Sequence, residues 1–157
     1  MKFRTAVFGD LDEMKRLYVD TIQFVCRNDY NDDERKQWSS SANKTERWSE
    51  MIKNQYVLIA ETKSQIVGFA TLKHQNYIDF FYIHKDFQRK GIAQKLLNKI
   101  ESRALEYGTT ILTSDISITA KPFFEKNGFI VEAKQENKRG NLVLINYKMK
   151  KILVHKA

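Results

Sequence analysis

The six residues 88–93, Gln-Arg-Lys-Gly-Ile-Ala, combine positive charge with a glycine at the predicted start of a helix. Apolar residues recur at helical spacing over 92–107, and Gly108 follows as a typical C-terminal stop. Arg89 and Lys90 precede the first turn, where unpaired N–H groups carry a partial positive charge and favour Asp or Glu. Two cations at that end of a helix require an explanation.

An anion bound at residues 88–93 would explain why two cations stand at the start of this helix. The N–H groups at a helix N-terminus bind phosphate, and Gly91 carries no Cβ that would keep a phosphate away from the backbone. Gln88 would add neutral donors, while Arg89 and Lys90 would add charge. The alternative is an ordinary helix start whose cations face water, which costs about 0.3–1 kcal/mol.

Other recognisable chemistry is missing from the sequence. No GxGxxG or GxxxxGK[ST] loop occurs, so dinucleotide and Walker-type nucleotide sites are disfavoured. No HExxH or paired CxxC spacing occurs either, and no metal is expected. A GxSxG nucleophile elbow is also absent, which disfavours a serine hydrolase of that type.

Composition limits the class of protein further. A chain of 157 residues with 42% hydrophobic and 29% charged residues indicates a single soluble domain over 1–157. No window approaches the ~18 consecutive apolar residues of a membrane helix, and no membrane partner is expected. The single cysteine, Cys26, indicates a reducing compartment, so we expect a cytoplasmic protein.

The formal net charge of +8 favours an anionic partner. Nucleic acid, a membrane surface and a phosphate-bearing small molecule would all satisfy that charge. Because the basic residues are scattered along the chain, nucleic-acid binding is a less favoured function.

Hydrophobic patterning predicts an α/β protein with one central, mixed and mostly antiparallel sheet flanked by helices. One parallel βαβ crossover should join 77–83 to 109–115 through the helix at 92–107. Strands are predicted at 3–8, 56–61, 66–72, 77–83, 109–115, 129–135 and 141–149, and helical segments at about 11–25, 28–54, 92–107 and 119–127.

Two helix starts are predicted from capping patterns. Asp10 and Glu13 have the spacing of a capping box, so a helix should begin directly after Asp10. Thr119 should be the N-cap of a later helix, which places Pro122 in the first turn near N3 and leaves Ser117 free for other contacts.

In this setting, residues 88–93 resemble the Q/R-x-x-G-x-G/A signature of the GCN5-related N-acetyltransferase (GNAT) family, which follows a strand and opens a long helix. The stretch 113–129, TSDISITAKPFFEKNGF, resembles the family's second coenzyme segment, most of all in its YafP/YjaB-like bacterial branch. The run at 77–93 and a Trp…Arg-Trp pattern at 38–48 are also similar to that branch. The resemblance covers nearly the whole chain and implies the GNAT fold and an acetyl-CoA-dependent N-acetyltransferase.

The resemblance implies that an amine attacks the thioester of acetyl-CoA directly, with no acyl-enzyme, so Cys26 is not needed as a nucleophile. The backbone of 81–83 would pair with the pantetheine arm of the cofactor and point an N–H at the thioester oxygen. The residues expected to bind the cofactor are Phe81, Tyr82, Ile83, Gln88, Arg89, Lys90, Gly91, Ile92, Ala93, Ser117 and Phe124.

Asp79 is the first candidate for the proton acceptor. Asp is rare in strands, and a carboxylate among aromatic residues would have a raised pKa that suits it to accept the amine proton. The alternative is a structural ion pair with a Lys or Arg. Tyr77 is the second candidate, because several relatives carry their base at its position, and His74 and His84 flank the strand. Strand alternation would place Tyr77, Asp79, Phe81 and Ile83 on one face and Ile78, Phe80 and Tyr82 on the other.

Phe124 departs from the family pattern, since many relatives carry there a Tyr that protonates the departing thiolate. Ser117 likewise stands where many relatives carry Asn. Tyr82 or Tyr107 would then supply the acid, or the thiolate would leave stabilised by other groups. The alternative function is an acyl-CoA-binding sensor, or a subunit of a complex, with little turnover.

The acceptor is expected to be a small-molecule amine, aromatic or amphipathic in character. The N-terminal helices and the turn at 136–141 should form its pocket, with Tyr30, Trp38 and Trp48 as an aromatic wall. Ordinary core packing of these three residues is the alternative. A monomer or a homodimer is expected.

Overall fold

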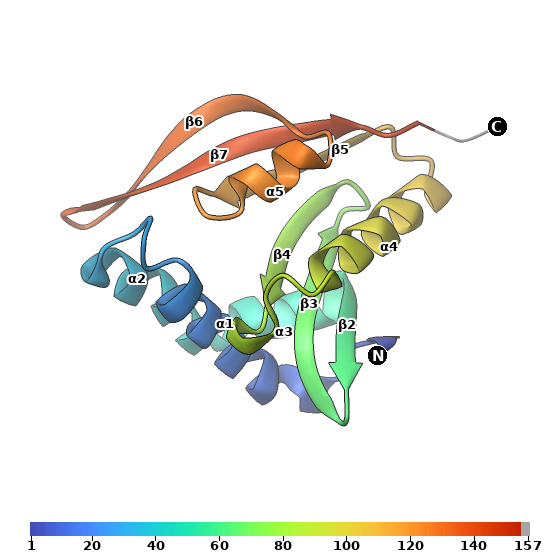
Figure 1. The fold of residues 1–157 in the computed structure, drawn as a ribbon, viewed down its shortest axis with the longest axis horizontal. Helices are drawn as coiled ribbons and strands as arrows, with labels where there is room; N and C mark the ends of the chain where they lie inside the picture. Colours follow the sequence, from blue (N-terminus) through green and yellow to red (C-terminus); the bar gives the residue numbers. More distant parts are fainter. Residues whose placement is uncertain (155–157) are drawn as a thin grey trace.

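The computed structural model describes residues 1–154, and its seven strands form one sheet in the order β1-β2-β3-β4-β5-β7-β6 (Figure 1). Neighbouring strands are antiparallel except β4 and β5, which are parallel and connected through α4. The predicted mixed sheet with one parallel crossover is therefore confirmed. The strands are β1 (Lys2–Thr5), β2 (Tyr56–Thr62), β3 (Gln65–Lys73), β4 (Tyr77–Ile83), β5 (Ile111–Ser117), β6 (Ile130–Arg139) and β7 (Leu142–Ile152), and the helices are α1 (Leu11–Val25), α2 (Asp32–Ser39), α3 (Thr45–Asn54), α4 (Ile92–Glu106) and α5 (Lys121–Lys126).

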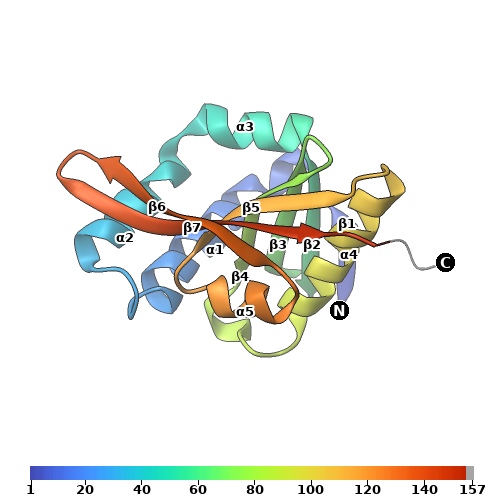
Figure 2. The same cartoon turned by 90° about the horizontal axis from the view of Figure 1, so that it is seen from above.

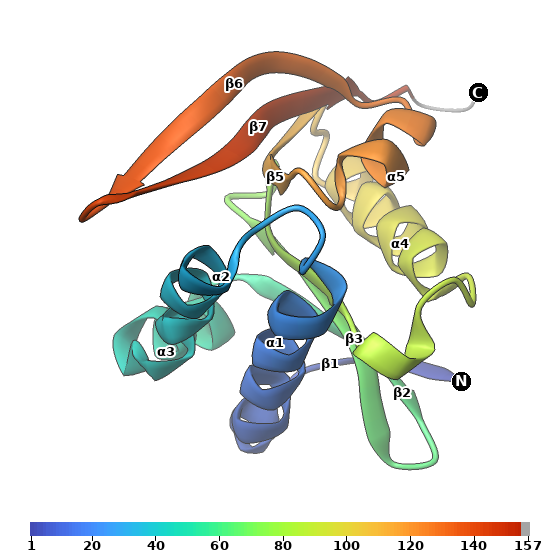
Figure 3. The same ribbon diagram turned by 60° about the vertical axis from the view of Figure 1, so that its left-hand side comes forward.

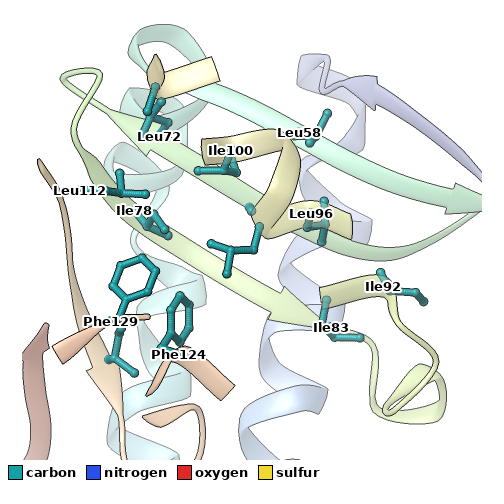
Figure 4. Close-up of a cluster of buried hydrophobic side chains, with 14 of the residues drawn as sticks. Leu58, Leu72, Ile78, Ile83, Ile92, Leu96, Ile100, Leu112, Phe124 and Phe129 are labelled. Atoms are coloured by element: carbon teal, nitrogen blue, oxygen red, sulfur yellow. The ribbon is translucent and has the colours of Figure 1, made fainter. Parts of the chain in front are cut away.

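Two apolar clusters, one on each face of the sheet, hold the helices in place. On the α1–α3 side, Met14 of α1 and Trp48 of α3 pack with Phe69 and Phe80 of the strands. On the α4–α5 side, the inward face of α4 and the buried part of α5 cover the other face of the same strands (Figure 4). That second cluster includes Leu58, Leu72, Ile78, Ile83, Ile92, Leu96, Ile100, Leu112, Phe124 and Phe129.

β6 and β7 form a long hairpin at the edge of the sheet, here called the β6–β7 arm. Figures 2 and 3 show the arm running past β5 towards α2 and arching away from β4. The Tyr30 hydroxyl, just before α2, donates to the carbonyl oxygen of Ile145 in β7. The arm is therefore tied to the helices on the α1–α3 side of the sheet.

α1 begins at Leu11 as predicted, but the predicted capping box at Asp10 and Glu13 is wrong. Asp10 has helical backbone angles, so its carboxylate does not cap α1; it accepts hydrogen bonds from Arg4 at 2.8 and 2.9 Å and from a backbone N–H. Glu13 accepts the N–H of Ile66 at 2.7 Å, which ties α1 to β3. The capping box lies instead at Asn31 and Glu34, where α2 begins, and the helical stretch predicted at 28–54 divides into α2 and α3.

The start of α5 also differs from the prediction. Ala120 is the N-cap, and Pro122 occupies the first turn as its missing N–H requires. The Thr119 hydroxyl donates to the carboxylate of Asp29 at 2.7 Å instead of capping the helix. The Ser117 Oγ accepts the N–H of Ala120 at 3.1 Å, so Ser117 is engaged in the turn and is not free as predicted.

A β-bulge in β4 overturns the predicted alternation of its side chains. Ala70 of β3 pairs with Phe81 and Leu72 pairs with Ile78, so Asp79 and Phe80 together lie opposite a single residue of β3. Asp79, Phe80 and Tyr82 consequently face the α1–α3 side, whereas Ile78, Phe81 and Ile83 face the α4–α5 side. The pattern fails because an extra residue interrupts the two-residue period of the strand.

Two observations concern membranes and metals. No helix among residues 1–154 is both long and apolar enough to cross a membrane. Within the same described residues, no group of three or more His, Cys, Asp or Glu side chains is arranged to hold a metal ion.

Candidate active site

The 88–93 loop has the geometry that an anion site requires. α4 begins at Ile92, and Gly91 before it adopts φ +80°, in the left-handed region that favours glycine. A Cβ on Gly91 would meet no heavy atom within 4 Å, so the glycine is explained by its backbone angle and opens onto free space. The first turn of α4 contains no acidic residue that would occupy its N–H groups. Arg89 and Lys90 are exposed beside it.

Gln88 holds this loop in place with its side-chain amide. Its Nε2 donates to the carbonyl oxygen of Ile83 at 2.8 Å and to that of His84 at 3.3 Å. The Thr21 hydroxyl of α1 donates to the same Ile83 oxygen at 2.8 Å. The expectation that the Gln88 amide adds donors to the anion is therefore wrong, because that amide is already used inside the protein.

β4 has an open edge beyond its first two residues. Its register with β5 contains only the pairs Tyr77 with Thr113 and Ile78 with Ser114, after which the strands separate. The N–H of His84 donates to β3 at 2.9 Å, so by strand alternation the polar groups of Phe81 point away from β3, towards the side that β5 has left.

The three residues predicted to pair with pantetheine differ in which of their backbone N–H and C=O groups remain available. Phe81 presents its N–H and C=O at the open edge. Ile83 also points its polar groups there, but its carbonyl oxygen is taken by Thr21 and Gln88. The backbone of Tyr82, which is paired with β3, faces the sheet. The open edge therefore matches the expected cofactor arm best at Phe81.

Asp79 forms an ion pair, which was the alternative to its predicted role as base. Arg47 of α3 donates to both carboxylate oxygens at 2.8 and 3.1 Å, and the Gln55 side chain donates at 2.7 Å. Burial alone would raise the pKa of Asp79, but the hydrogen bonds from Arg47 and Gln55 and the Arg47 charge outweigh it, so the pKa is lowered. The raised pKa expected from the sequence is wrong, and an ionised, paired Asp79 is a weak proton acceptor.

An Asp79→Asn variant should lose stability at neutral pH and much less at acidic pH. Since the folded-state pKa lies below the ordinary 3.8, the carboxylate stabilises the fold above that pH, and this contribution disappears as the pH falls through the lowered pKa. Urea unfolding of both proteins at pH 7 and near pH 3 measures the difference.

The matched control is Glu132→Gln, which removes an exposed carboxylate from β6 and should show no such pH-dependent difference. A stability gap between Asp79→Asn and wild type that is equal at both pH values would contradict the ion-pair assignment.

Tyr77 makes a short contact across the junction of β4 and β5. Its hydroxyl donates to Oδ2 of Asp115 at 2.6 Å, while Gln135 of the β6–β7 arm donates to Oδ1 of the same carboxylate at 2.9 Å. Burial and the neighbouring Asp115 raise the pKa of Tyr77, so its hydroxyl stays protonated. Asp115 was not singled out from the sequence, although it carries the same signal as Asp79, a carboxylate inside a strand.

The predicted aromatic wall is mostly core. Trp48 is 1% exposed and donates its indole N–H to the carbonyl oxygen of Ser41 at 3.0 Å. Tyr30 is 5% exposed, and burial raises its pKa to about 12. Trp38 alone is half-buried, with its ring centroid 5.2 Å from that of Tyr30 and 6.4 Å from that of Tyr82. The prediction that these residues line a pocket is wrong for Tyr30 and Trp48, which are buried in the core. For Trp38 it stays a prediction.

Phe124 lies in the core below the open edge of β4. It is 2% exposed, and its ring centroid is 5.3 Å from that of Phe81 and 5.1 Å from that of Phe129. Its side chain supports the strand from the α4–α5 side.

The other residues considered from the sequence for proton transfer or nucleophilic attack lie in different parts of the fold. Tyr107 is the C-cap of α4, at the end of the helix opposite the 88–93 loop, and its role as the acid stays a prediction. His74 lies in the turn between β3 and β4, while His84 follows β4 and packs against Phe87. Burial strongly raises the pKa of Tyr82 and raises that of Cys26 to about 11, so both stay protonated.

An uncapped helix start at Gly91 and an open edge of β4 lie along the same side of the sheet, an arrangement that suits a long, phosphate-bearing ligand. The comparisons with known proteins identify the family of this protein. The family model described as "Acetyltransferase (GNAT) domain" matches residues 26–151. The chain belongs to this family of acetyl-CoA-dependent N-acetyltransferases.

Individual relatives agree with the assignment. The chain is 30% identical over 121 residues to the Escherichia coli protein "Uncharacterized N-acetyltransferase YafP", covering 77% of this chain and 75% of YafP. It superposes with a TM-score of 0.92 and 28% identity on a Rhodopseudomonas palustris structure described as "GCN5-Related N-acetyltransferase: Aminotransferase, Class-II", covering 97% and 95% of the two chains. The PaiA N-acetyltransferase of Thermoplasma acidophilum, solved in complex with coenzyme A, has the same fold, with a TM-score of 0.78, 19% identity and coverage of 96% and 98%.

Acetyl-CoA fits the residues that are present. Its diphosphate is an anion for the N–H groups and cations of the 88–93 loop, and the amides of its pantetheine arm suit the open edge at Phe81. No acidic side chain stands in the first turn of α4 to oppose it.

Proposed function

We propose that the protein transfers the acetyl group of acetyl-CoA to the primary amine of a small molecule by direct attack of the amine on the thioester. The observation that supports this most is the polar surface on the α1–α3 side of the β4–β5 junction, here called the acceptor face. It is formed by Tyr77, Asp79, Asp115, Gln135 and Asn146, which are linked by hydrogen bonds or share the junction.

The acceptor face meets the open edge where the two strands separate. Acetyl-CoA supplies the activated acetyl group there. The Phe81 N–H would donate to the charge that develops on the thioester oxygen, as backbone donors do in acyl transfer. Asp79, held by Arg47, fixes the bulge that sets the direction of this N–H and so acts as a positioning residue. A nitrogen–carbon bond forms as the carbon–sulfur bond breaks, with the electron pair leaving on sulfur.

Trp38 supports an acceptor with an apolar or aromatic part. Trp38 is half-buried beside the acceptor face, where its ring contacts those of Tyr30 and Tyr82. A flat apolar group on the acceptor would pack against the exposed part of the Trp38 ring.

A second candidate, an acyl-CoA sensor with little turnover, is favoured by Phe124. This buried side chain has no hydroxyl to protonate the leaving thiolate. A free thiol has a pKa of about 8.5, however, so a thiolate is a tolerable leaving group near neutral pH without a dedicated acid. We therefore favour the enzyme.

Release of free thiol from acetyl-CoA, measured against a panel of alkyl-, aryl- and amphipathic amines, tests the proposal. We expect amine-dependent release well above the rate without amine, and faster release for acceptors with an aromatic or apolar part. A protein that is stabilised by acetyl-CoA but releases no thiol with any amine would be the sensor instead.

A further inference from the structure

We propose that Asp115 is the final proton acceptor of the reaction and that Tyr77 carries the proton to it. The inference rests on the proposed function, since it concerns the proton that the acceptor amine must lose. It adds a carboxylate from β5 to a site otherwise built on β4 and α4.

The position of the pair supports this role. Tyr77 and Asp115 flank the last paired residues of β4 and β5, Ile78 and Ser114, beyond which the strands separate. The Tyr77 hydroxyl bridges the two strands to reach Oδ2 of Asp115 at 2.6 Å. Both side chains therefore stand at the closed end of the open edge, on the acceptor face.

Asp115 has the surroundings of a proton acceptor, and Asp79 does not. Asp79 is covered by Arg47 and Gln55, which stabilise its charged form. Asp115 receives hydrogen bonds only from the neutral groups of Tyr77 and Gln135 among the described residues, and it forms no ion pair with any of residues 1–154. It is also exposed, so its proton has a route to water.

Charged groups from two neighbouring strands, β7 and β3, and from β4 itself face this pair. Lys148 of β7 is the cross-strand partner of Asp115, and Lys150 of β7 is the partner of Thr113. Lys73 of β3 is the partner of Tyr77. Asp79 of β4 also acts on the Tyr77 hydroxyl through its charge. The three lysines add positive charge near the pair, and none of them forms an ion pair with Asp115 among the described residues.

Amide side chains from the β6–β7 arm orient Asp115. The Nε2 of Gln135 lies 2.9 Å from both Oδ1 of Asp115 and Oδ1 of Asn146. Asn137 donates to the same Asn146 oxygen at 2.9 Å and to the backbone of Leu144 at 3.0 Å. Oδ1 of Asp115 is thus held by the arm, which leaves Oδ2 directed at Tyr77.

The proton transfer balances without any further reactant. As the nitrogen–carbon bond forms, the amine proton moves to the Tyr77 oxygen while the Tyr77 proton moves to Oδ2 of Asp115. Tyr77 therefore ends as it began, and Asp115 becomes a neutral acid that releases its proton to water. Because burial and Asp115 hold the Tyr77 hydroxyl in its protonated form, the two transfers must occur together.

The test compares Asp115→Asn, Tyr77→Phe and the double variant with wild type, using the best amine from the panel. We expect each single variant to lower kcat/KM by about 10²–10⁴ at neutral pH, the usual contribution of a positioned acid or base. The double variant should be no worse than either single one, since both remove the same relay. Glu132→Gln, which removes a carboxylate from the arm outside the network, should keep wild-type activity.

A pH profile separates a relay from a merely structural role. The deficit of Asp115→Asn should narrow as the pH rises, because a growing fraction of the amine is already neutral and hydroxide replaces the relay. The acetyl-CoA-induced rise in melting temperature should match wild type in both single variants, which shows that the fold and the cofactor site are intact. Tyr77→Phe keeps the ring and the carboxylate, so it reports on the relay even where Asp115→Asn folds poorly.

Two results would overturn the inference, and they differ in what else they affect. If wild type turns over and the variants stay within about threefold of it at every pH, the relay is wrong and the transferase remains. If wild type binds acetyl-CoA and releases no thiol with any amine, the proposed function fails and the relay fails with it.

Discussion

A Gly91→Asp variant should lose the rise in melting temperature that acetyl-CoA produces in the wild-type protein. At a hundredfold excess over its dissociation constant, a ligand stabilises a protein by about 2.7 kcal/mol, or about 5–10 °C for a domain of this size. The new carboxylate would stand at the N-terminus of α4, in the open space beside Gly91, where the diphosphate binds in our proposal. Like charges would exclude each other there, so the shift should vanish.

Gly108→Asp is the matched control for this experiment. Gly91 has φ +80° and Gly108, at the other end of α4, has φ +82°, and a Cβ at either position meets no heavy atom within 4 Å. The two variants therefore carry the same backbone strain and the same new charge. We expect both to melt at a lower temperature than wild type, but only Gly108→Asp to keep its response to acetyl-CoA. A full response in Gly91→Asp would contradict the phosphate site.

Trp48→Ala should destabilise the protein by about 3–5 kcal/mol, the range for a large aromatic residue removed from a core. The Trp48 ring centroid is 5.2 Å from that of Tyr18 and 5.0 Å from that of Phe80, so its loss opens a cavity between α1, α3 and the sheet. The hydrogen bond to Ser41 is lost as well. Urea unfolding followed by circular dichroism measures the change.

Trp38→Ala is the corresponding variant at the half-buried position. We expect a smaller loss of stability, because part of this side chain is already in contact with water, together with a raised KM for acceptors that have an aromatic part. Equal destabilisation by the two variants would show that Trp38 is also a core residue. A change in KM for acetyl-CoA in place of the amine would remove Trp38 from the acceptor pocket.

Local signals explain what could be predicted from the sequence. The helix after Gly91 and the strand at 77–83 have strong periodicity, and their ends carry a glycine or a change of pattern, so their bounds nearly match the structure. The loop at 88–93 was informative for another reason. Its cations contradict the charge preference of a helix start, and such a conflict between neighbouring signals points to a ligand.

The catalytic details depend on partners that are distant in the chain, and periodicity carries no information about them. Asp79 has a lowered pKa because of Arg47, which is 32 residues away. Asp115 and Tyr77 are 38 residues apart and meet only because β4 and β5 pair in parallel. In each case the residue type was visible in the sequence and the contact that decides its chemistry was not.

The aromatic residues show the same limit. Trp38 and Trp48 stand in similar polar, helical surroundings in the sequence, and both suit a pocket or a core equally well. A 3-10 turn at Ser40–Asn43 separates their helices, and this turn directs Trp48 inwards while Trp38 stays near the surface. Tyr30 is placed by its hydrogen bonds to the backbone of Ile118 and Ile145, two segments from the far end of the chain.

The bulge in β4 has a consequence for how this strand tolerates changes of length. In a regular strand pair, each residue of β3 has one residue of β4 opposite it, whereas here Asp79 and Phe80 lie opposite a single residue. Deleting Asp79 would therefore leave every other side chain of β4 on its present face. Deleting any residue of β4 after Phe80 would instead turn the residues that follow it to the opposite face of the sheet. A residue at position 79 can therefore be inserted or deleted without repacking the interior. Its deletion would straighten the strand and narrow the gap beside β5.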